Sequence, residues 1–485
     1  MIDVKQQARA PFVEALEQYC ALHMTAFHTP GHKLGAGAPS YEKQQFGPAL
    51  ARDLGVMYAL DDLFEPEGPL REAMELAADL YGAGRTFFSV NGTTACIEAM
   101  ILAVCKPGDA IILPREAHKS VLNGVVLSGA VPVYMEGGFA PKEDVALGPT
   151  VEAFHKAIAK RPDAKAVVFT YPTYDGVCCD LGALITAAHE KGLYVLVDEA
   201  HGAHLAFHEE LPRHALSLDA DCVAQSTHKL IGSLTQTSML HCRKGFPCVD
   251  AVAKAMHLVQ STSPHYWFLA SLDAARQQMA LEGHKREEQT LGLARMVRSE
   301  IQRIPGLSCF SKSDICRYDG VADFDETKLT IAFDGLGLTG AEAERLLRKE
   351  GIEVELTAGN HVLALMTIGD SRETAQALLH ACRKVAKTHA LVAPKKVPAL
   401  PLPAPTVVVT PRQAWFGQYE DIPFAEAQGR ISAETVTFYP PGIPVVAVGE
   451  ELTAPVLAYM TEKRGQGYEA NGAHDNTLRT LRVLV

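Results

Sequence analysis

Short apolar runs alternate with helical patterns over residues 69–230, and this alternation restricts the fold more than any other feature. Runs typical of buried strands lie at Thr86–Val90, Ala110–Leu113, Val131–Met135, Ala166–Thr170, Tyr194–Val197 and Cys222–Gln225. Helical spacing of apolar residues occurs between them, as at Pro69–Tyr81, Val151–Lys160 and Leu181–Lys191. Strands that alternate with helices of this length predict an α/β fold with a parallel sheet and right-handed crossovers.

Polar clusters follow five of the predicted strands, at the point where each strand ends. They are Gly92–Thr94, His118, Tyr174-Asp175, Asp198–His201 and Ser226–Lys229. The carboxyl ends of parallel strands meet at one edge of the sheet, and ligands of α/β proteins collect there. We therefore expect the clusters to form a single site.

The residue types at two neighbouring strand ends suit pyridoxal phosphate (PLP). Asp198 ends one strand, and Lys229 follows the next. A lysine amine can form a Schiff base with the cofactor aldehyde, and an aspartate can keep the pyridinium nitrogen protonated. Ser226 and His228 flank the lysine and could hold the phosphate. The alternative is an exposed Asp and Lys at unrelated strand ends, which would be preferred for either residue alone.

A second phosphate-binding element is predicted where the strand Thr86–Val90 meets Asn91-Gly92-Thr93-Thr94 and a helix that runs to about Cys105. A helix start of this kind offers free backbone N–H groups and the positive end of the helix dipole to an anion. A threonine-capped helix without a ligand is the common alternative. The segment is not a Walker loop, because no Gly-Lys-Ser/Thr follows.

Composition excludes several classes of protein. A chain of 485 residues with 47% hydrophobic and 21% charged residues is typical of a globular protein of about three domains. The net charge of −12 does not favour nucleic-acid or anionic-membrane binding. The N-terminus lacks the apolar core of a signal peptide, and no run approaches the ~18 apolar residues of a membrane span. The 11 cysteines include no CxxC pair, which favours reduced thiols in the cytoplasm, and we expect no metal site.

The remaining chain predicts further domains. An amphipathic helix is expected from Asp273 to about Ile304, followed by strands at Leu307–Phe310, Lys328–Phe333 and Val362–Thr367 and helices at Gly340–Glu350 and Arg372–His389. The predicted divisions are a lead-in segment (1–35), a PLP-binding large domain (36–265), a small α+β domain with the connecting helix (266–391), a proline-rich linker (392–405) and a C-terminal domain (406–485).

Long motifs across nearly the whole chain resemble the Orn/Lys/Arg decarboxylase family. They include HTPGHK, LDDLFEPEGPL, LPREAHKSVLNGVVLSGA, YPTYDGVCCDL, VDEAHGAH, QSTHKLIGSLTQTSMLH and, near the C-terminus, GRISAETVTFYPPGIPVVAVGEELT. Members of this family are fold type I PLP-dependent enzymes of the aspartate aminotransferase type. The chain begins at the lead-in to the PLP domain, so it resembles the shorter biosynthetic members that decarboxylate arginine.

The resemblance implies a role for each candidate site residue. Lys229 is similar to the Schiff-base lysine, Asp198 to the pyridinium partner and His118 to the histidine that stacks on the ring. The hydroxyls and imidazole expected at the phosphate are those of Thr93, Thr94, Ser226 and His228. His201 is suited to bind the cofactor's 3-hydroxyl, although a structural histidine with a backbone partner is the alternative. The freed Lys229 or a nearby histidine would return the proton to Cα.

The implied reaction is PLP-dependent α-decarboxylation of a basic amino acid, with arginine converted to agmatine and CO2 for polyamine biosynthesis. Lysine and ornithine are the alternative substrates, and a non-catalytic regulatory or binding protein is the alternative of another class. Side-chain recognition needs acidic residues, and the candidates are Asp61, Asp62, Glu65, Glu67 and Glu434. The resemblance also implies a homodimer or a dimer of dimers, in which Ser261-Thr262-Ser263 would complete the partner's phosphate pocket. A helix-capping cluster is the alternative for these three residues.

Overall fold

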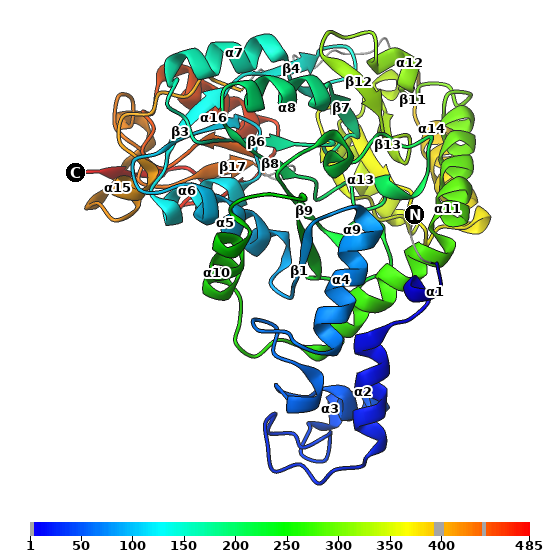
Figure 1. The fold of residues 1–485 in the computed structure, drawn as a ribbon. Coiled ribbons are helices and arrows are strands. Elements are labelled where there is room, and N and C mark those ends of the chain that lie inside the picture. Colours follow the sequence, from blue (N-terminus) through cyan, green and yellow to red (C-terminus); the bar gives the residue numbers. More distant parts are fainter. Residues whose placement is uncertain (1–3, 392–401, 439–442) are drawn as a thin grey trace. The chain divides into compact units, whose positions relative to one another are not determined.

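The computed structural model describes residues 4–391, 402–438 and 443–485 (Figure 1). It divides into two compact units, which are described separately. Unit 1 consists of Met1–Ala103 and Leu196–Glu287, and unit 2 of Val104–Val195 and Glu288–Val485. The predicted domain boundaries stay predictions, and residues 392–401 of the predicted linker lie outside the described residues.

Unit 1 contains four strands that lie side by side in the order β1 (Arg85–Ser89), β10 (Ser238–Cys242), β9 (Cys222–Gln225) and β8 (Tyr194–Asp198). Strand β10 is antiparallel to both β1 and β9, whereas β8 and β9 are parallel. Strands β1, β9 and β8 therefore run in the same direction and end at one edge. The helices are α1 (Val4–Gln7), α2 (Pro11–Ala21), α3 (Ser40–Phe46), α4 (Pro69–Tyr81), α5 (Gly92–Val104), α9 (Thr227–Leu230), α10 (Val249–Val259) and the first part of α11 (Tyr266–Ile301).

The sequence predicted β8 and β9 closely but did not predict β10. The β10 segment reads Ser-Met-Leu-His-Cys, and every one of its residues is buried. A histidine and a serine interrupt the apolar run by which a buried strand is recognised. Both can be buried only because they find hydrogen-bond partners elsewhere in the fold. The presence of β10 makes the sheet mixed, within the predicted α/β class.

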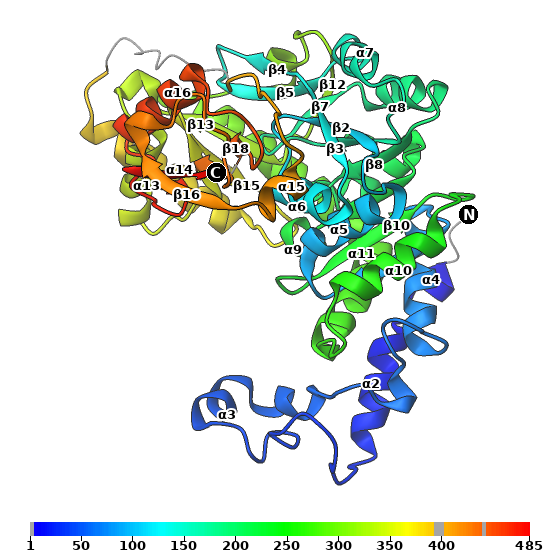
Figure 2. The same cartoon turned by 90° about the vertical axis from the view of Figure 1, so that its left-hand side faces the viewer.

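A buried ion pair attaches the N-terminal helices of unit 1 to α11. Arg276 and Asp273 are both fully buried, with 2.7 Å between Nη2 and Oδ1. Arg276 also donates to the Gln7 carbonyl, and the Phe12 N–H donates to Asp273 Oδ2 (2.9 Å). The segment that contains α3, between α2 and α4, extends away from the strands of its own unit (Figure 2).

Unit 2 contains three parallel strands in the order β6 (Ala166–Thr170), β2 (Ala110–Pro114) and β3 (Val131–Met135), so β3 is the edge strand. The accompanying helices are α6 (Lys119–Ser128), α7 (Val151–Lys160) and α8 (Leu181–Glu190). Strands β4 (Gly137–Ala140) and β5 (Val145–Pro149) form a hairpin, and β7 (Val177–Cys179) pairs with β12 (Val321–Phe324).

The predicted small α+β segment is present in unit 2. Its antiparallel sheet has the order β11 (Ser308–Cys309), β13 (Lys328–Ala332), β15 (His361–Leu365) and β14 (Leu356–Ala358). Its helices are α12 (Lys312–Ile315), α13 (Gly340–Lys349) and α14 (Arg372–Thr388). These elements and the end of α11 share one apolar core. The predicted strands and helices of this segment are confirmed with boundaries that differ by a few residues, and the connecting helix α11 begins at Tyr266 instead of the predicted Asp273.

The C-terminal part of unit 2 has an apolar core of its own. Its elements are α15 (Pro411–Trp415), β16 (Tyr419–Pro423), β17 (Val436–Phe438), β18 (Ile443–Val446), α16 (Ala454–Gly465), β19 (Ala470–Asn471) and β20 (Thr480–Leu484). Arg115, which directly follows β2, reaches this part and forms a bidentate ion pair with Glu450 at 2.7 and 3.0 Å. The two side chains are 7% and 2% exposed, so the pair is a buried link within unit 2. No helix in the described part of the chain is both long and apolar enough to cross a bilayer.

Candidate functional site

Asp198 and Lys229 follow neighbouring strands of unit 1, as predicted. Asp198 is the last residue of β8 and is 4% exposed, and its Cα is paired with that of Ala224 on β9. Lys229 lies in the short helix α9, which begins two residues after β9 ends. The Lys229 Nζ is 2.9 Å from the Nε2 of His201, a buried residue in the loop after β8. The strand-end loops therefore bring a primary amine and an imidazole into direct contact.

The hydrogen bond between His201 and Lys229 bears on the reactivity of the amine. A lysine attacks an aldehyde only as the neutral amine, so a neighbour that accepts its proton makes it a better nucleophile. A neutral imidazole can accept that hydrogen bond at Nε2. His201 thus contacts the lysine itself, whereas the sequence predicted a contact with the cofactor's 3-hydroxyl, which stays a prediction.

The predicted anion-binding helix start is present at α5. Gly92 has a φ of +74°, which a side chain would strain, and α5 begins there. The Thr93 hydroxyl bonds to the hydroxyls of Ser226 and Ser238, and Ser238 donates to the Gln225 carbonyl (2.6 Å). Because that carbonyl takes the Ser238 hydrogen, Thr93 donates to Ser238, and Ser226 donates to Thr93. Thr93 therefore orients Ser226.

Two of the predicted phosphate ligands have polar atoms that the protein does not use. Thr94 is exposed, and its hydroxyl makes no hydrogen bond to another described residue. His228 donates from Nδ1 to the Thr237 carbonyl (2.7 Å), which fixes its ring and leaves Nε2 for a ligand. Burial lowers the pKa of His228, although the bond to Thr237 opposes the shift. A bound phosphate would favour the protonated ring, which donates from both nitrogens.

His118 lies in unit 2 and caps the N-terminus of α6. Ser120 donates to its Nδ1 from the backbone N–H (3.2 Å) and from the hydroxyl (2.8 Å). With Nδ1 as the acceptor, the ring hydrogen lies on Nε2 and the orientation of the imidazole is fixed. The predicted stacking of His118 on a cofactor ring stays a prediction.

A chain of buried hydrogen bonds crosses all four strands of unit 1 directly behind Asp198. Glu199 accepts from the Ala215 N–H (2.7 Å) and from Gln225 Nε2 (2.7 Å). The Gln225 Oε1 accepts from His241 Nε2 (3.1 Å), and His241 Nδ1 accepts from the Thr86 hydroxyl (2.8 Å). Burial raises the pKa of Glu199 to about 8 and lowers that of His241 to about 3. Neutral groups therefore form this chain around pH 7.

Sequence reasoning missed the supporting residues of the site, namely Glu199, Gln225, Ser238 and His241. All of them lie inside or beside segments that were recognised, VDEAHGAH and QSTHKLIGSLTQTSMLH. A polar residue at a position expected to be buried in a strand was the available signal, because such a residue needs a hydrogen-bond partner.

The acidic residues considered for substrate binding have mainly structural contacts. Asp61 accepts from the backbone N–H groups of Gly68 and Leu70 at the start of α4. Glu434 accepts from the N–H groups of His474 (2.6 Å) and Arg482 (2.9 Å). Asp62 accepts from the Phe64 N–H, and Glu65 and Glu67 are exposed. The backbone bonds of Asp61 and Glu434 would compete with a substrate.

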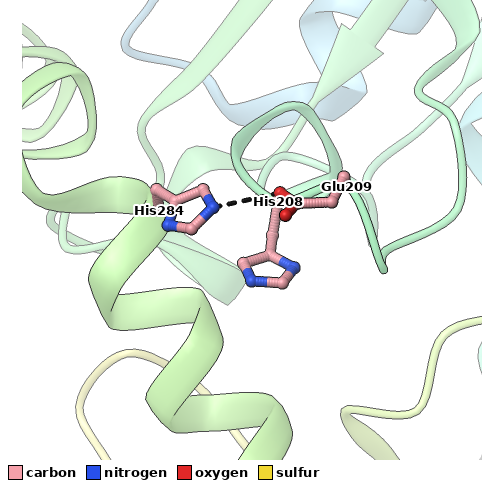
Figure 3. A group of neighbouring side chains, drawn as sticks. All are labelled: His208, Glu209 and His284. Carbon is pink, nitrogen blue, oxygen red and sulfur yellow. Dashed lines mark hydrogen bonds and ion pairs between the residues drawn. The ribbon is translucent and has the colours of Figure 1, made fainter.

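One group of side chains in unit 1 has donor types that suit a transition metal (Figure 3). Ligand atoms of His208, Glu209 and His284 lie within 4.8 Å of one another. Glu209 accepts from His284 Nε2 (3.0 Å), and His208 Nδ1 accepts from the Glu210 N–H (3.2 Å). These bonds satisfy Glu209 and fix the ring hydrogen of His208 on Nε2, which is then no ligand. We assign no metal to this group.

The residues of unit 1 fit PLP by their chemistry. Lys229 offers a primary amine beside an imidazole, Asp198 offers a strand-end carboxylate, and α5 offers unpaired N–H groups together with Thr94 and the Nε2 of His228. This set combines covalent attachment, support for a protonated ring nitrogen and an anion site.

Comparison with known proteins identifies relatives along the whole chain. Residues 10–374 match the model of the Orn/Lys/Arg decarboxylase major domain, and residues 395–470 match that of its C-terminal domain. An arginine decarboxylase of Bacillus subtilis is 40% identical over 99% of this chain and 98% of the relative. The lysine decarboxylase LdcA of Pseudomonas aeruginosa is more distant, at 26% identity over 93% of this chain and 75% of the relative.

Solved structures show the same fold. The lysine decarboxylase LdcF of Francisella novicida superposes with a TM-score of 0.87 at 20% identity, over 99% of this chain and 82% of the other. The cysteine desulfurase CsdA of Escherichia coli superposes with a TM-score of 0.51 at 19% identity, over 78% of this chain and 92% of the other. The predicted α/β class and fold type I architecture are confirmed.

The raised pKa of Glu199 predicts a pH-dependent stability. Between the usual value of 4.5 and about 8, the folded protein holds a proton that the unfolded chain releases. This contribution is complete below pH 4.5 and is lost as the pH rises through 8. Glutamine cannot titrate, so the difference in Tm between wild type and Glu199→Gln should fall steadily from pH 5 to pH 8. The control is Glu75→Gln, an exposed residue whose difference should stay constant. A constant difference for Glu199→Gln would contradict the assignment.

Proposed function

The chain belongs to the Orn/Lys/Arg decarboxylase family, and we propose that it converts L-arginine to agmatine and CO2. It is a decarboxylase whose cofactor is pyridoxal 5'-phosphate. The contact between Lys229 Nζ and His201 Nε2 beside the Asp198 strand end carries the assignment of the reactive centre. The choice of arginine is supported by full-length relatives at about 40% identity that are named arginine decarboxylases.

The residues of unit 1 divide the work of the reaction. When bound, PLP supplies an electron-accepting ring for the electron pair of the breaking Cα–carboxylate bond. Lys229 would hold the cofactor covalently through Nζ and would be displaced by the substrate amine. Asp198 holds a proton on the ring nitrogen and so stabilises negative charge that develops on the ring. The start of α5, Thr94 and His228 hold the phosphate, and Ser226 is oriented by Thr93.

Proton transfer centres on Lys229 and His201. Once displaced, Lys229 would be a free amine that takes up the proton given up by the substrate ammonium, and its Nζ lies 2.9 Å from His201 Nε2. A protonated Lys229 would donate its proton to Cα once CO2 has left and would thereby become the neutral amine that the next turnover needs, with His201 Nε2 accepting its hydrogen bond. Orientation of the Cα–carboxylate bond relative to the cofactor would decide which bond breaks.

A homodimer is the proposed assembly, with a further pairing of dimers as the alternative. The segment between α2 and α4 carries exposed apolar side chains, among them Phe27 (94% exposed), Tyr41 (71%) and Tyr58 (106%). Exposed apolar groups gathered in one segment are typical of a protein interface. The Ser261 N–H bonds to the Asn91 Oδ1 beside α5, so the exposed segment Ser261–Ser263 lies near an anion site. Its contribution to a partner's site stays a prediction.

The cytoplasm is the proposed location, and polyamine synthesis is the proposed role. All 11 cysteines are free, including Cys222 and Cys242, whose sulfurs lie 3.7 Å apart in paired strands. Free thiols so close together favour a reducing compartment. Agmatine, the proposed product, can be converted chemically to a diamine, which supports the polyamine role.

Replacement of Lys229 tests the catalytic assignment and separates an enzyme from a non-catalytic relative. Lys229→Ala removes the amine that binds the cofactor covalently, so decarboxylation should fall by about three orders of magnitude or more. The variant should retain PLP only weakly and lack the visible absorbance of the lysine-bound cofactor. Lys254→Ala, an exposed lysine of α10, serves as the control and should keep wild-type turnover. Normal CO2 release by Lys229→Ala would refute the assignment.

Competition among basic amino acids tests the substrate. A site built for the planar guanidinium group binds it through two parallel hydrogen bonds, which an ammonium group cannot replace. We therefore expect the kcat/KM for arginine to exceed those for lysine and ornithine by about tenfold or more. The measurement is CO2 release from each amino acid at equal concentration. A higher value for lysine would reverse the substrate choice and leave the decarboxylase assignment intact.

The exposed apolar segment gives a test of assembly. The double variant Phe27→Ser, Tyr58→Ser should shift the protein from dimer toward monomer in sedimentation velocity, because it removes apolar area from the proposed interface. Leu281→Ser, an exposed leucine of α11, is the control and should leave the dimer intact. A wild-type protein that sediments as a fully active monomer would contradict the proposal.

A further inference from the structure

Unit 2 encloses a cavity of about 800 Å³ that no step of the proposed reaction uses. Its walls are the end of β2 with the following Arg115 and Glu116, the edge strand β3, the β4–β5 hairpin, the Asp175 loop, the β14–β15 turn and C-terminal side chains such as Tyr459 and Tyr468. The volume is typical of small-molecule sites. None of the residues predicted to bind the cofactor lines this cavity, whereas Tyr174 and Asp175, one of the five polar clusters expected at a single site, do line it.

Glu116 places a carboxylate in this wall without a cationic partner. Its Oε1 has no accessible surface and no hydrogen-bond partner among the described residues. The carboxylate packs against the backbone of Gly137, where a Cβ would come within 2.2 Å of Oε1. The adjacent Arg115 is already neutralised, because both of its terminal nitrogens bind Glu450 at 2.7 and 3.0 Å. Glu116 is therefore a partly buried acid that no lysine or arginine of the described residues pairs with.

Asp175 is the second such acid. It is 14% exposed and accepts from the Thr330 hydroxyl (2.9 Å). The nearest basic group is the Nε2 of His361 at 3.8 Å, and burial lowers the pKa of His361, so that ring is neutral around pH 7. Within the described ranges, no lysine or arginine forms an ion pair with Glu116 or Asp175. Burial raises the pKa of Glu116 to about 7 and that of Asp175 to about 6.

Three of the four lysines and arginines that line the cavity have acidic partners, which argues against an anionic ligand. Arg161 pairs with Asp163 at 2.9 Å. Lys463 lies over the rings of Tyr459 (5.5 Å) and Tyr468 (4.9 Å) and interacts with the nearby Asp144. Lys160 is exposed. A tyrosine pair that already receives one cation shows that this wall suits positive charge.

We propose that this cavity is a second binding site for a small aliphatic cation with amine or guanidine groups. Its charged ends pair with Glu116 and Asp175. A bound cation supplies the positive charge that both acids lack, and each carboxylate is ionised in the complex. The site goes beyond the proposed reaction and does not depend on which basic amino acid is decarboxylated. Agmatine, the proposed product, belongs to this class of ligand.

Calorimetric titration of the reduced holoenzyme with agmatine tests the proposal. Borohydride first fixes the cofactor on Lys229, so that added amines no longer react with it. The reduced protein should bind one agmatine per chain. The variants Glu116→Gln and Asp175→Asn should each raise the Kd by about tenfold or more. Glu136→Gln, an exposed acid in the same wall, is the matched control and should leave the Kd unchanged.

Two results would overturn the site. One is the absence of binding by both agmatine and putrescine, and the other is an equal Kd in all variants. If Glu116→Gln loses PLP or stability, Gly137→Ala replaces it, because its methyl group must displace the Glu116 carboxylate and weaken binding in the same way. Decarboxylation of arginine is measured separately, so a failure of the proposed reaction is distinguished from a failure of this site.

Discussion

The buried hydrogen-bond chain from Glu199 through Gln225 and His241 to Thr86 is the constraint on which the reactive centre depends. It joins the ends and interiors of β8, β9, β10 and β1, and all of its members are almost fully buried. A register slip in any of these strands would leave buried polar groups without partners, which costs roughly 1–3 kcal/mol each. Asp198 immediately precedes Glu199 in the chain, so the constraint that fixes Glu199 also fixes Asp198.

The buried ion pair between Arg115 and Glu450 constrains unit 2 in the same way, because its polar groups also need one another as partners. The Arg115–Glu450 pair joins the end of β2 to the C-terminal part of the chain, and Arg115 also donates to the Val445 carbonyl (2.7 Å). Removal of one member of such a pair leaves the other as a buried charge without a partner. The contact is therefore compatible with only one arrangement of the two segments. Because Arg115 is paired with Glu450, it does not serve as a counter-ion for the neighbouring Glu116. The Glu116 carboxylate therefore stays available to a ligand.

Much of the candidate site could be predicted because its chemistry is carried by residues that directly follow strands. Asp198 after β8, Lys229 after β9 and Gly92–Thr94 after β1 lie where an α/β sheet collects ligands, and the recognised motifs span them. Strand β10 could not be predicted, because its polar residues Ser238 and His241 are satisfied by partners distant in sequence, on β9 and at the start of α5. The contact between His201 and Lys229 was missed for the same reason, since it joins two loops that the sequence separates.

The sequence by itself determined the fold class, the cofactor chemistry and the family. These depend on local periodicity and on the order of residue types along the chain, which are properties of the chain before it folds. Only the tertiary structure decided that Thr93 orients Ser226, that Asp61 and Glu434 bind backbone N–H groups, and that Glu116 and Asp175 share one cavity. Each of these facts depends on which polar groups are buried together and which hydrogen-bond partners they find there. Those partners are distant in sequence and meet only when the chain packs.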